Sequence, residues 1–569
     1  MRAAAVEAAP AWTIRAGSEV VDLDADGTVL GRAAWNPADV AGAVSSRPDT
    51  RWVWADTAAV YPEFLAAGTR VDRAWDLRLS RRILRLSPLV DAAARLAAPD
   101  VWDRAAEPMP VSDALFALTD GPVLGVDDLV AELSRQRALT DGAADAARLR
   151  LLLHAESAGA LIAAEMHAAG LPWDRAAHER ILVEVLGARA ASGAPPEKMQ
   201  QLAAVVRAAL GDPAASLDSP PKLLRSLHRV GVMVASTSRW ELAEQQHPVV
   251  EPLLEYKKMA RLLSANGWGW LDEWVRDGRF RPVYIPAGVV TGRWASNGGG
   301  ALQIPRQLRP AMRADPGWVI VDADVAQLEP RVLAGMSRDA RMATAARGLD
   351  LYEGIVATGA VATREEAKYA VLGAMYGATS GDSGRLVPRL RRAFPAAMAL
   401  VDDAARIGEE AGAVSTWLGR GSPPPEDAWL ALQSLSTEEG TDAAVSERAR
   451  RSARDRGRFT RNYIVQGTAA EWALCWLAEI RHRLSQLPAV VDAPTADRSG
   501  PAFARRAHLV FFLHDEVIVH APAAQAEQVA AIVVEAATAA GRRMFGTFPI
   551  DFPLDVAVSP AGGAVTADG

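Results

Sequence analysis

Two aspartates, far apart in the chain, each follow a short apolar run. Asp324 lies in Val-Ile-Val-Asp-Ala-Asp-Val, and Asp515 lies in Phe-Phe-Leu-His-Asp-Glu. Runs of this length favour buried strands. Either aspartate alone could be an ordinary turn or cap residue. A fold that pairs them would place two carboxylates at the ends of neighbouring strands, an arrangement suited to divalent cations.

A second pattern lies between them. Residues Arg364, Lys368, Leu372 and Tyr376 recur every four positions, so they lie near one face of a predicted helix. Arginine and lysine suit phosphate oxygens, and an aromatic side chain can cover a base. Such a helix alone is commonly just solvent-exposed. Together with the aspartates, it favours phosphoryl or nucleotidyl transfer with two metal ions.

Composition limits the alternatives. A chain of 569 residues exceeds one core and predicts several domains. The single cysteine, Cys475, excludes an internal disulfide framework and a cysteine-based zinc site. The net charge of -7 is unusual for a nucleic-acid binder, but the arginine-rich segment 448–461 could still face phosphates. No early stretch resembles a secretion signal and no long apolar run appears, so we expect a cytoplasmic protein without membrane association.

Local patterns predict several elements. We expect strands around 52–54, helices over 77–86, 148–170 and 470–484, and a hairpin over 508–520 with His-Asp-Glu at its tip. The proline-containing stretch 419–441 predicts an exposed loop, and the tail after Val558 a frayed end.

Six motifs occur in one order along the chain: Thr291-Gly-Arg293, Leu302-Gln-Ile-Pro305, Asp324 to Arg331, Arg364-x-x-x-Lys368 with Tyr376-Gly377, Gln466-Gly-Thr-Ala-Ala470, and His514-Asp-Glu516. Over roughly residues 150 to 558 the chain therefore resembles the family A, or DNA polymerase I-like, DNA polymerases. The resemblance implies an α+β multidomain chain with a right-hand fold of palm, fingers and thumb, preceded by an RNase H-like exonuclease-type α/β domain. It divides the chain into an exonuclease-like domain (1–150), a mostly helical thumb (151–282), a first palm part (283–338), fingers (339–455) and a second palm part (456–569).

The resemblance also implies roles for single residues. Asp324 and Asp515 would bind metal with the Val325 carbonyl, and Glu516 would be a supporting carboxylate. Lys368 would grip the triphosphate and could donate a proton to pyrophosphate. The remaining nucleotide-binding positions would be Arg364, Leu372, Tyr376, Gln327 and Glu329, of which Glu329 would exclude a ribose 2'-hydroxyl. The primer-template contacts would be Arg293, Arg458, Asn462, Gln466 and His514.

Four positions depart from the family pattern. Leu372 replaces an aromatic residue, which leaves a smaller apolar face against the sugar. Val325-Ala326 replaces the usual Tyr-Ser after the first aspartate, and Pro330 replaces a leucine. Proline is tolerated in the first turn of a helix, so the fold is expected to survive.

The first 150 residues match less well. Asp56 and Asp145 could correspond to two carboxylates of the exonuclease, but no Asp-x-Glu occurs in the expected first strand. Asp22-Leu-Asp24 fits a hairpin better, and Asp141 stands where a tyrosine is expected. We therefore interpret this domain as a structural remnant whose exonuclease activity is lost or weak.

The implied function is template-directed addition of dNTPs to a primer 3'-hydroxyl in DNA replication or repair. It would use two Mg2+ ions, with Mn2+ as a possible substitute, and the protein would act on primer-template DNA as a monomer. Two alternatives stay open. A single-subunit RNA polymerase or reverse-transcribing relative is disfavoured by Glu329, and a non-catalytic DNA-binding relative is disfavoured by the retention of Asp324, Lys368 and Asp515.

Overall fold

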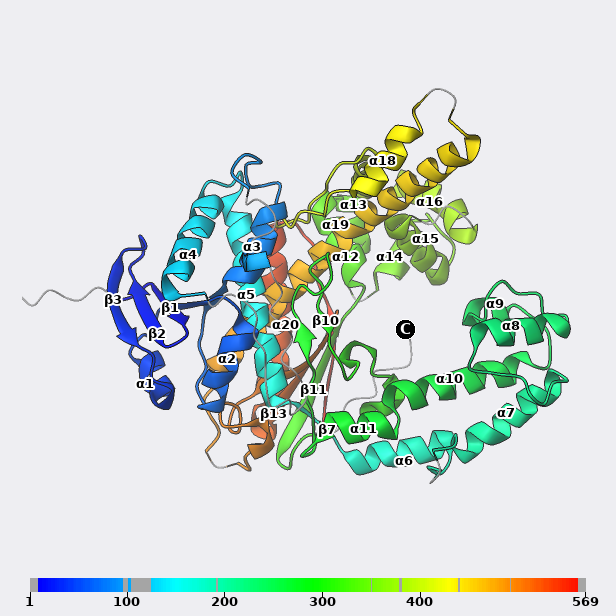
Figure 1. Ribbon diagram of the computed structural model, residues 1–569, viewed down its shortest axis with the longest axis horizontal. Helices are drawn as coiled ribbons and strands as arrows, with labels where there is room; N and C mark the ends of the chain where they lie inside the picture. Colours follow the sequence, from blue (N-terminus) through cyan, green and yellow to red (C-terminus); the bar gives the residue numbers. More distant parts are fainter. Residues whose placement is uncertain are drawn as a thin grey trace, which may run out of the picture.

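The computed structural model describes residues 9–95, 101–103, 124–190, 193–348, 350–377, 381–438, 441–491 and 493–560. In Figure 1 the N-terminal strands lie on the left and a central sheet lies in the middle. One group of helices lies at the lower right and another at the upper right. No helix in the described ranges has the length and apolarity needed to cross a membrane.

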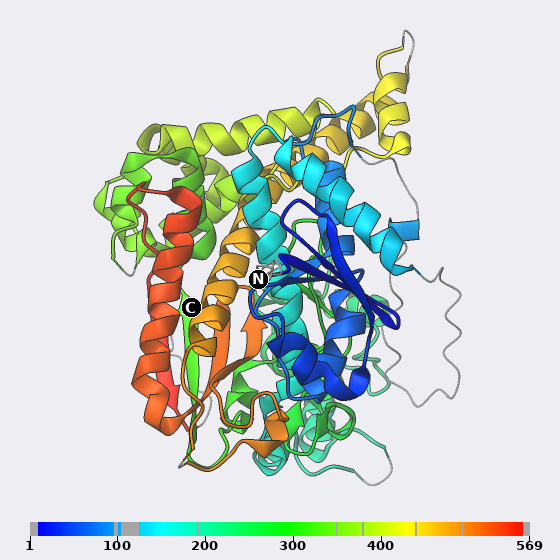
Figure 2. The same cartoon turned by 90° about the vertical axis from the view of Figure 1, so that its left-hand side faces the viewer.

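The central sheet is antiparallel and has the order β12-β13-β11-β14. Its strands are β11 (Trp318–Val325), β12 (His508–Leu513), β13 (Glu516–Pro522) and β14 (Leu554–Ser559). Valine, isoleucine and phenylalanine fill these strands and favour extended backbone. Helix α20 (Ala526–Phe545) packs on β11, β13 and β14, while α5 (Ala146–Ala169) and α19 (Ala443–Ser485) contact β12. Figure 2 shows α20 beside α19.

The helices at the lower right follow α5. They are α6 (Arg175–Leu186), α7 (Glu197–Ala209), α8 (Pro220–Arg229), α9 (Arg239–Ala243), α10 (Val250–Asn266) and α11 (Trp268–Trp274). Strand β6 (Leu171–Pro172) precedes these helices. The chain returns from them to the central sheet through four short strands: β7 (Val275–Arg276), β8 (Arg279–Phe280), β9 (Tyr284–Ile285) and β10 (Ala295–Ser296).

The helices at the upper right share a second apolar core. They are α12 (Leu328–Ser337), α13 (Ala340–Ala345), α14 (Leu351–Ala357), α15 (Arg364–Tyr376), α16 (Gly381–Ala393) and α17 (Pro395–Glu409). Helix α18 (Asp427–Leu435) has no buried residue and contacts α19 instead. The first half of α19 packs along α17, so this group is joined to the central sheet by one continuous helix.

The N-terminal sheet has the order β3-β2-β1-β4-β5, with β1, β4 and β5 parallel. Its strands are β1 (Trp12–Ala16), β2 (Glu19–Leu23), β3 (Val29–Ala34), β4 (Arg51–Trp54) and β5 (Ala74–Asp76). Helices α1 (Val40–Ser45), α2 (Thr57–Ala66), α3 (Leu77–Leu86) and α4 (Val126–Asp141) accompany it. Trp52 and Trp54 pack against Phe64 in its core.

Most of the expected elements are confirmed, including β4, α3 and the 508–520 hairpin. Pro330 does lie in the first turn of α12. The prediction of an exposed loop over 419–441 is wrong for part of this stretch, because helix α18 (Asp427–Leu435) forms there. The prolines suggested a loop, but Trp429 packs on α19, where its indole nitrogen donates to Ser452 O (3.3 Å). Of the expected frayed tail, residues 561–569 lie outside the described ranges.

Two expected domain boundaries fall inside helices. The boundary after residue 150 lies within α5, and the boundary after residue 455 lies within α19. Because a helix transmits rigid orientation along its length, these two helices connect the regions on either side of each boundary without a flexible linker.

A buried ion network joins α5, α19, helix α2 and the segment between α2 and β5. Glu165 accepts hydrogen bonds from Arg481 (2.7 Å), Arg70 (2.9 Å) and the Tyr61 hydroxyl (2.7 Å). Burial alone would raise the pKa of Glu165, but Arg481 and Arg70 outweigh it and lower that pKa to about 2. The carboxylate is therefore charged and satisfied, and it links α19 to the N-terminal region.

We expect Glu165→Ala to lower the free energy of unfolding by about 3 to 5 kcal/mol, because it leaves the buried Arg481 without its counter-ion. Urea unfolding followed by circular dichroism measures this. Asp141→Ala removes the exposed pair with Arg150 (2.8 Å) and should cost less than about 1 kcal/mol. Equal effects of the two changes would contradict the role given to the network.

Two buried histidines face each other in the central sheet. His508 and His520 are cross-strand partners with ring centroids 5.3 Å apart. Burial lowers the pKa of His508 from 6.5 to about 4 and that of His520 well below 6.5, and nearby Arg279 acts in the same direction. Both rings are thus held neutral in the fold.

The contribution of these two histidines to stability should therefore fall with acidification. The unfolded chain binds protons near pH 6.5 that the folded histidines resist until about pH 4, so their share of the free energy of unfolding decreases as pH falls through this window. Thermal unfolding at about pH 7 and about pH 5 checks this. His520→Phe should flatten the dependence, whereas the exposed His482→Phe should leave it unchanged.

Candidate functional site

Strand pairing brings the predicted carboxylates together at one end of the central sheet. Asp324 lies opposite Glu516 in the β11–β13 register. The two-residue turn before Glu516 has His514 in the left-handed region (φ 57°), and the carbonyl of Asp515 accepts from the Val325 amide (2.9 Å). The tip of the hairpin is thereby fixed beside the end of β11, as the sequence predicted.

Burial and neighbouring negative charges raise the pKa of both Asp324 and Asp515. Burial, then Asp515 and Glu516, raise the pKa of Asp324 to about 7. Burial raises the pKa of Asp515 to about 6, and Glu516 adds to it. Half-buried carboxylates that repel one another create a strong preference for added cations.

A second carboxylate on β11 was missed by the sequence reasoning. Asp322 precedes Asp324 by two positions, so both side chains lie on one face of β11. Arg309 donates to Asp322 (2.9 Å) and to Glu516 (2.5 Å). Burial, then Glu516, raise the pKa of Asp322 to about 7. Strand alternation could have identified Asp322, whereas nothing in the sequence pattern pointed to Arg309.

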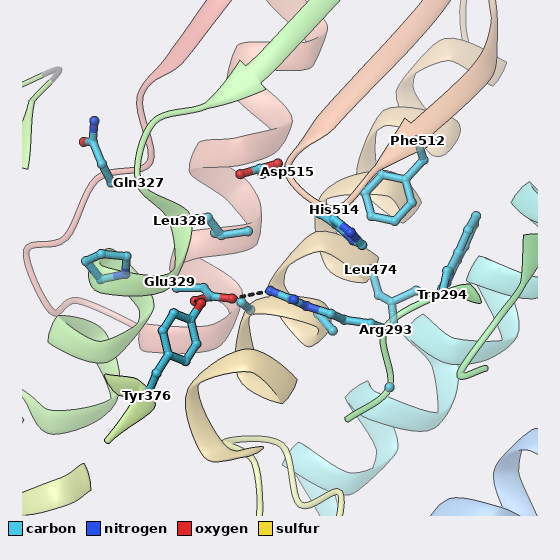
Figure 3. A pocket seen from close by; sticks show the side chains of 14 residues that line it. Arg293, Trp294, Gln327, Leu328, Glu329, Tyr376, Leu474, Phe512, His514 and Asp515 are labelled. Atoms are coloured by element: carbon cyan, nitrogen blue, oxygen red, sulfur yellow. Dashed lines mark hydrogen bonds and ion pairs between the residues drawn. The ribbon is translucent and has the colours of Figure 1, made fainter. Parts of the chain in front are cut away.

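A cavity of about 300 Å3 opens beside Asp515 (Figure 3). Its wall includes Arg293, Glu329, Tyr376 and His514. Glu329 accepts from both the Arg293 guanidinium and the Tyr376 hydroxyl, so it is clamped between helix α15 and the 291–293 turn. Burial, then Glu329, raise the pKa of Tyr376, which keeps its hydroxyl a donor.

The predicted phosphate-binding face lies on α15. Arg364 begins the helix and its Nε donates to Asp350 (2.7 Å). Lys368 is partly exposed, and no hydrogen bond or ion pair of its amino group occurs within the described ranges. Leu372 packs against the second core. Gln327 points away from Asp515 in Figure 3 and accepts from the Leu351 amide (3.1 Å), so it braces the helix junction.

The predicted DNA-contact residues Arg458, Asn462 and Gln466 lie on helix α19. Arg458 pairs with Asp455, and a Cβ on Gly377 would come within 2.8 Å of its Cγ, so the end of α15 packs closely on α19. Gln466 accepts from the Thr291 hydroxyl (3.3 Å), and the Asn462 side-chain oxygen is buried without a partner among the described residues. Ala469 and Ala470 line the cavity wall itself.

The carboxylates proposed for the N-terminal domain act as helix caps. Asp56 caps α2 and lies 3.5 Å from Arg78, while Asp145 caps α5 and pairs with Arg148 (3.2 Å). The first strand carries Thr13 and Arg15, and the Arg15 guanidinium pairs with Glu63 (2.6 Å). Asp24 accepts from the amides of Asp26 and Thr28, which confirms the hairpin expected for the 22–24 segment.

The donor set at the central sheet fits Mg2+. Across the described ranges no three His, Cys, Asp or Glu side chains gather in a way that could hold a metal. Mg2+ is commonly bound through one or two carboxylates, with substrate phosphates and water completing its shell. Asp324 and Asp515 supply such a pair of hard oxygen ligands, and their mutual repulsion would be relieved by a cation.

Comparisons with known proteins agree with this geometry. DNA polymerase I from Thermus filiformis is 27% identical over 343 residues, covering 55% of this chain and 36% of its own length. DNA polymerase I from Chloroflexus aurantiacus is 27% identical over 344 residues, covering 56% of this chain and 32% of its own length. The chain thus spans about a third of the length of these curated relatives.

A solved structure shows the same fold. The POL domain of Pol1 from M. smegmatis, in complex with DNA primer-template and dNTP, matches with a TM-score of 0.62 at 18% identity. The match covers 96% of this chain and 93% of that one. The profile described as DNA polymerase family A matches residues 197–562, which is more than half of the sequence. The chain belongs to DNA polymerase family A.

Proposed function

We propose that the protein is a DNA-directed DNA polymerase that adds dNTPs to a primer 3'-hydroxyl on a template, in DNA replication or repair. The observation that carries the proposal is the placing of Asp324 and Asp515 at adjoining strand ends, beside a cavity walled by Glu329 and Tyr376. The relatives named DNA polymerase I support it.

Asp324, Asp515 and the Val325 carbonyl would hold two Mg2+ ions. Bound there, such ions would lower the pKa of the attacking hydroxyl and stabilise the charge on the phosphates. Lys368 and Arg364 would bind the triphosphate, and Lys368 would donate a proton to the departing pyrophosphate. For this, Arg364 must exchange Asp350 for a phosphate, whereas Lys368 is already available.

Contacts to DNA would be independent of sequence. Arginine and glutamine can bind phosphates and the acceptors that every base pair presents in the minor groove. Arg293, Arg458, Asn462, Gln466 and His514 would make these contacts near the primer terminus. Tyr376 would close over the templating position, and Glu329 would contact the sugar.

Primer extension tests the proposal. A labelled primer on a longer template, with Mg2+ and the four dNTPs, should be elongated to the template end. EDTA should stop the reaction, and rNTPs should replace dNTPs poorly because Glu329 would occupy the space of a 2'-hydroxyl. Failure of the wild-type protein to extend the primer, with DNA binding retained, would favour the non-catalytic relative instead.

We also propose that the N-terminal domain lacks 3'-5' exonuclease activity. In support, β1 carries Thr13 and Arg15, and the Arg15 cation is directed at Glu63. A 3'-mismatched primer incubated with Mg2+ and no nucleotides should remain intact. Degradation of this primer that Asp56→Ala abolishes would overturn the assignment.

A further inference from the structure

A second cavity, of about 350 Å3, lies between the N-terminal sheet and the helices of the central sheet. Its wall is built from the start of β4 and the segment before β5, from α5, and from the C-terminal halves of α19 and α20. It shares no wall residue with the cavity beside Asp515. The cavity therefore needs a separate explanation.

Two arginines stand side by side at its rim. Trp52 pairs with Ala74 in the parallel β4–β5 register, so the preceding residues Arg51 and Arg73 begin neighbouring strands. Arg51 donates to the Ala74 carbonyl (3.1 Å) and Arg73 donates to the Asp49 carbonyl. Neither guanidinium pairs with a carboxylate within the described ranges. Burial, then the charge of Arg73, lower the pKa of Arg51 to about 10.

The carboxylates of the wall do not offset these charges. Glu479 is shared by Arg543 (2.7 Å) and Arg483 (2.9 Å). Arg481 belongs to the Glu165 network already described. Asp72 is exposed. Burial, then Arg51, Arg150 and Arg73, lower the pKa of His154 to about 3, so this wall residue is neutral and adds no charge of its own.

Apart from His482, which is exposed, the remaining wall is apolar. It consists of Ala74, Leu151, Ala155, Ala158, Leu161, Cys475 and Ala478. A cavity with a cationic rim and an aliphatic floor suits a ligand with an anionic group at one end and an uncharged organic group at the other. Each guanidinium is planar and presents a fork of N–H donors that matches phosphate oxygens, and two of them lie next to each other here.

We propose that this cavity binds a small organic phosphate of nucleoside-monophosphate size, with the phosphate held by Arg51 and Arg73 and the organic group against α5 and α19. The site is also distinct from the exonuclease-like carboxylates. Asp56 follows the carboxyl end of β4 and Asp145 caps α5, whereas Arg51 and Arg73 lie at the amino ends of β4 and β5. The proposal is independent of the polymerase activity.

Isothermal titration calorimetry on the full chain, in EDTA, tests the site with dAMP, deoxyadenosine and inorganic phosphate. We expect dAMP to bind, and each of the other two to bind roughly 10-fold or more weakly, since each lacks one half of the ligand. No binding of dAMP would overturn the proposal. Equal affinity for inorganic phosphate and dAMP would overturn the part given to the apolar floor.

Variants locate the binding. The double variant Arg51→Ala with Arg73→Ala should weaken dAMP binding by roughly 10-fold or more. The single variant Arg73→Ala should also weaken dAMP binding, and because it changes an exposed side chain its folding is not at risk. Arg32→Ala, which breaks an exposed pair with Asp127, is the matched control and should leave binding unchanged. Arg364→Ala with Lys368→Ala should also leave it unchanged. Loss of binding in this last variant, or full binding without Arg51 and Arg73, would overturn the proposal.

Discussion

Asp515→Asn is expected to lower the rate of primer extension by roughly 10^3-fold or more, since groups that act as one unit in catalysis lose nearly all of their effect when one is removed. Asparagine keeps the size of the side chain and the turn, but it lacks the negative charge that a divalent cation requires. Asp515 is fixed through its backbone, by the bond from the Val325 amide, so the substitution leaves the hairpin in place.

The same substitution should stabilise the metal-free protein. The raised pKa values of Asp324 and Asp515 mean that the fold tolerates these groups best when they are protonated, and that stability is lost as pH rises through about 6 to 7. At about pH 8 both are charged and repel each other. Asp515→Asn should then raise the melting temperature in EDTA and reduce the further rise produced by Mg2+.

Asp403→Asn is the matched control, because Asp403 is an exposed aspartate on α17. It should change neither the extension rate nor the response of the melting temperature to Mg2+. Extension by Asp515→Asn at more than about a tenth of the wild-type rate would contradict the metal-binding role. A lower melting temperature in EDTA would contradict the repulsion between the two aspartates.

The sequence could predict the carboxylate pair because both members follow the simplest rules. Asp324 ends an apolar strand, Asp515 lies in a hairpin turn, and strand alternation and turn chemistry are local properties. The helix from Arg364 to Tyr376 was predictable for the same reason, since its periodicity lies within one element. The structure places each of them in the expected element.

Contacts between elements could not be predicted in this way. Arg309 lies in a short 3-10 turn without periodicity, yet it joins Asp322 and Glu516. The link between Glu329 and Tyr376 joins two helices whose relative position depends on the second core. Arg51 and Arg73 become neighbours only through a parallel strand pairing. Each of these depends on tertiary packing, which a local pattern does not specify.

Under the proposed function, the contact between Glu329 and Tyr376 would also bear on which nucleotide sugar the protein accepts. Glu329 is half-buried and is held by Arg293 on one side and by Tyr376 on the other, so its carboxylate cannot easily swing away from the cavity. A rigid side chain excludes an additional hydroxyl by steric clash more effectively than a mobile one. Tyr376→Phe tests the hydrogen bond separately from the presence of Glu329. It removes the hydroxyl that donates to Glu329 but keeps the aromatic ring.

Glu329→Ala is therefore expected to raise the efficiency of ribonucleotide incorporation, relative to that of deoxynucleotides, on the order of 10^2-fold. Tyr376→Phe should raise it less, because Arg293 still holds the carboxylate. Single-nucleotide extension with dATP and ATP, compared as kcat/KM, measures both. If Glu329→Ala leaves the ratio unchanged while primer extension with dNTPs persists, the clamped carboxylate is not the sugar-discriminating group. If Tyr376→Phe equals Glu329→Ala, the hydrogen bond from Tyr376 rather than the bulk of Glu329 sets the discrimination.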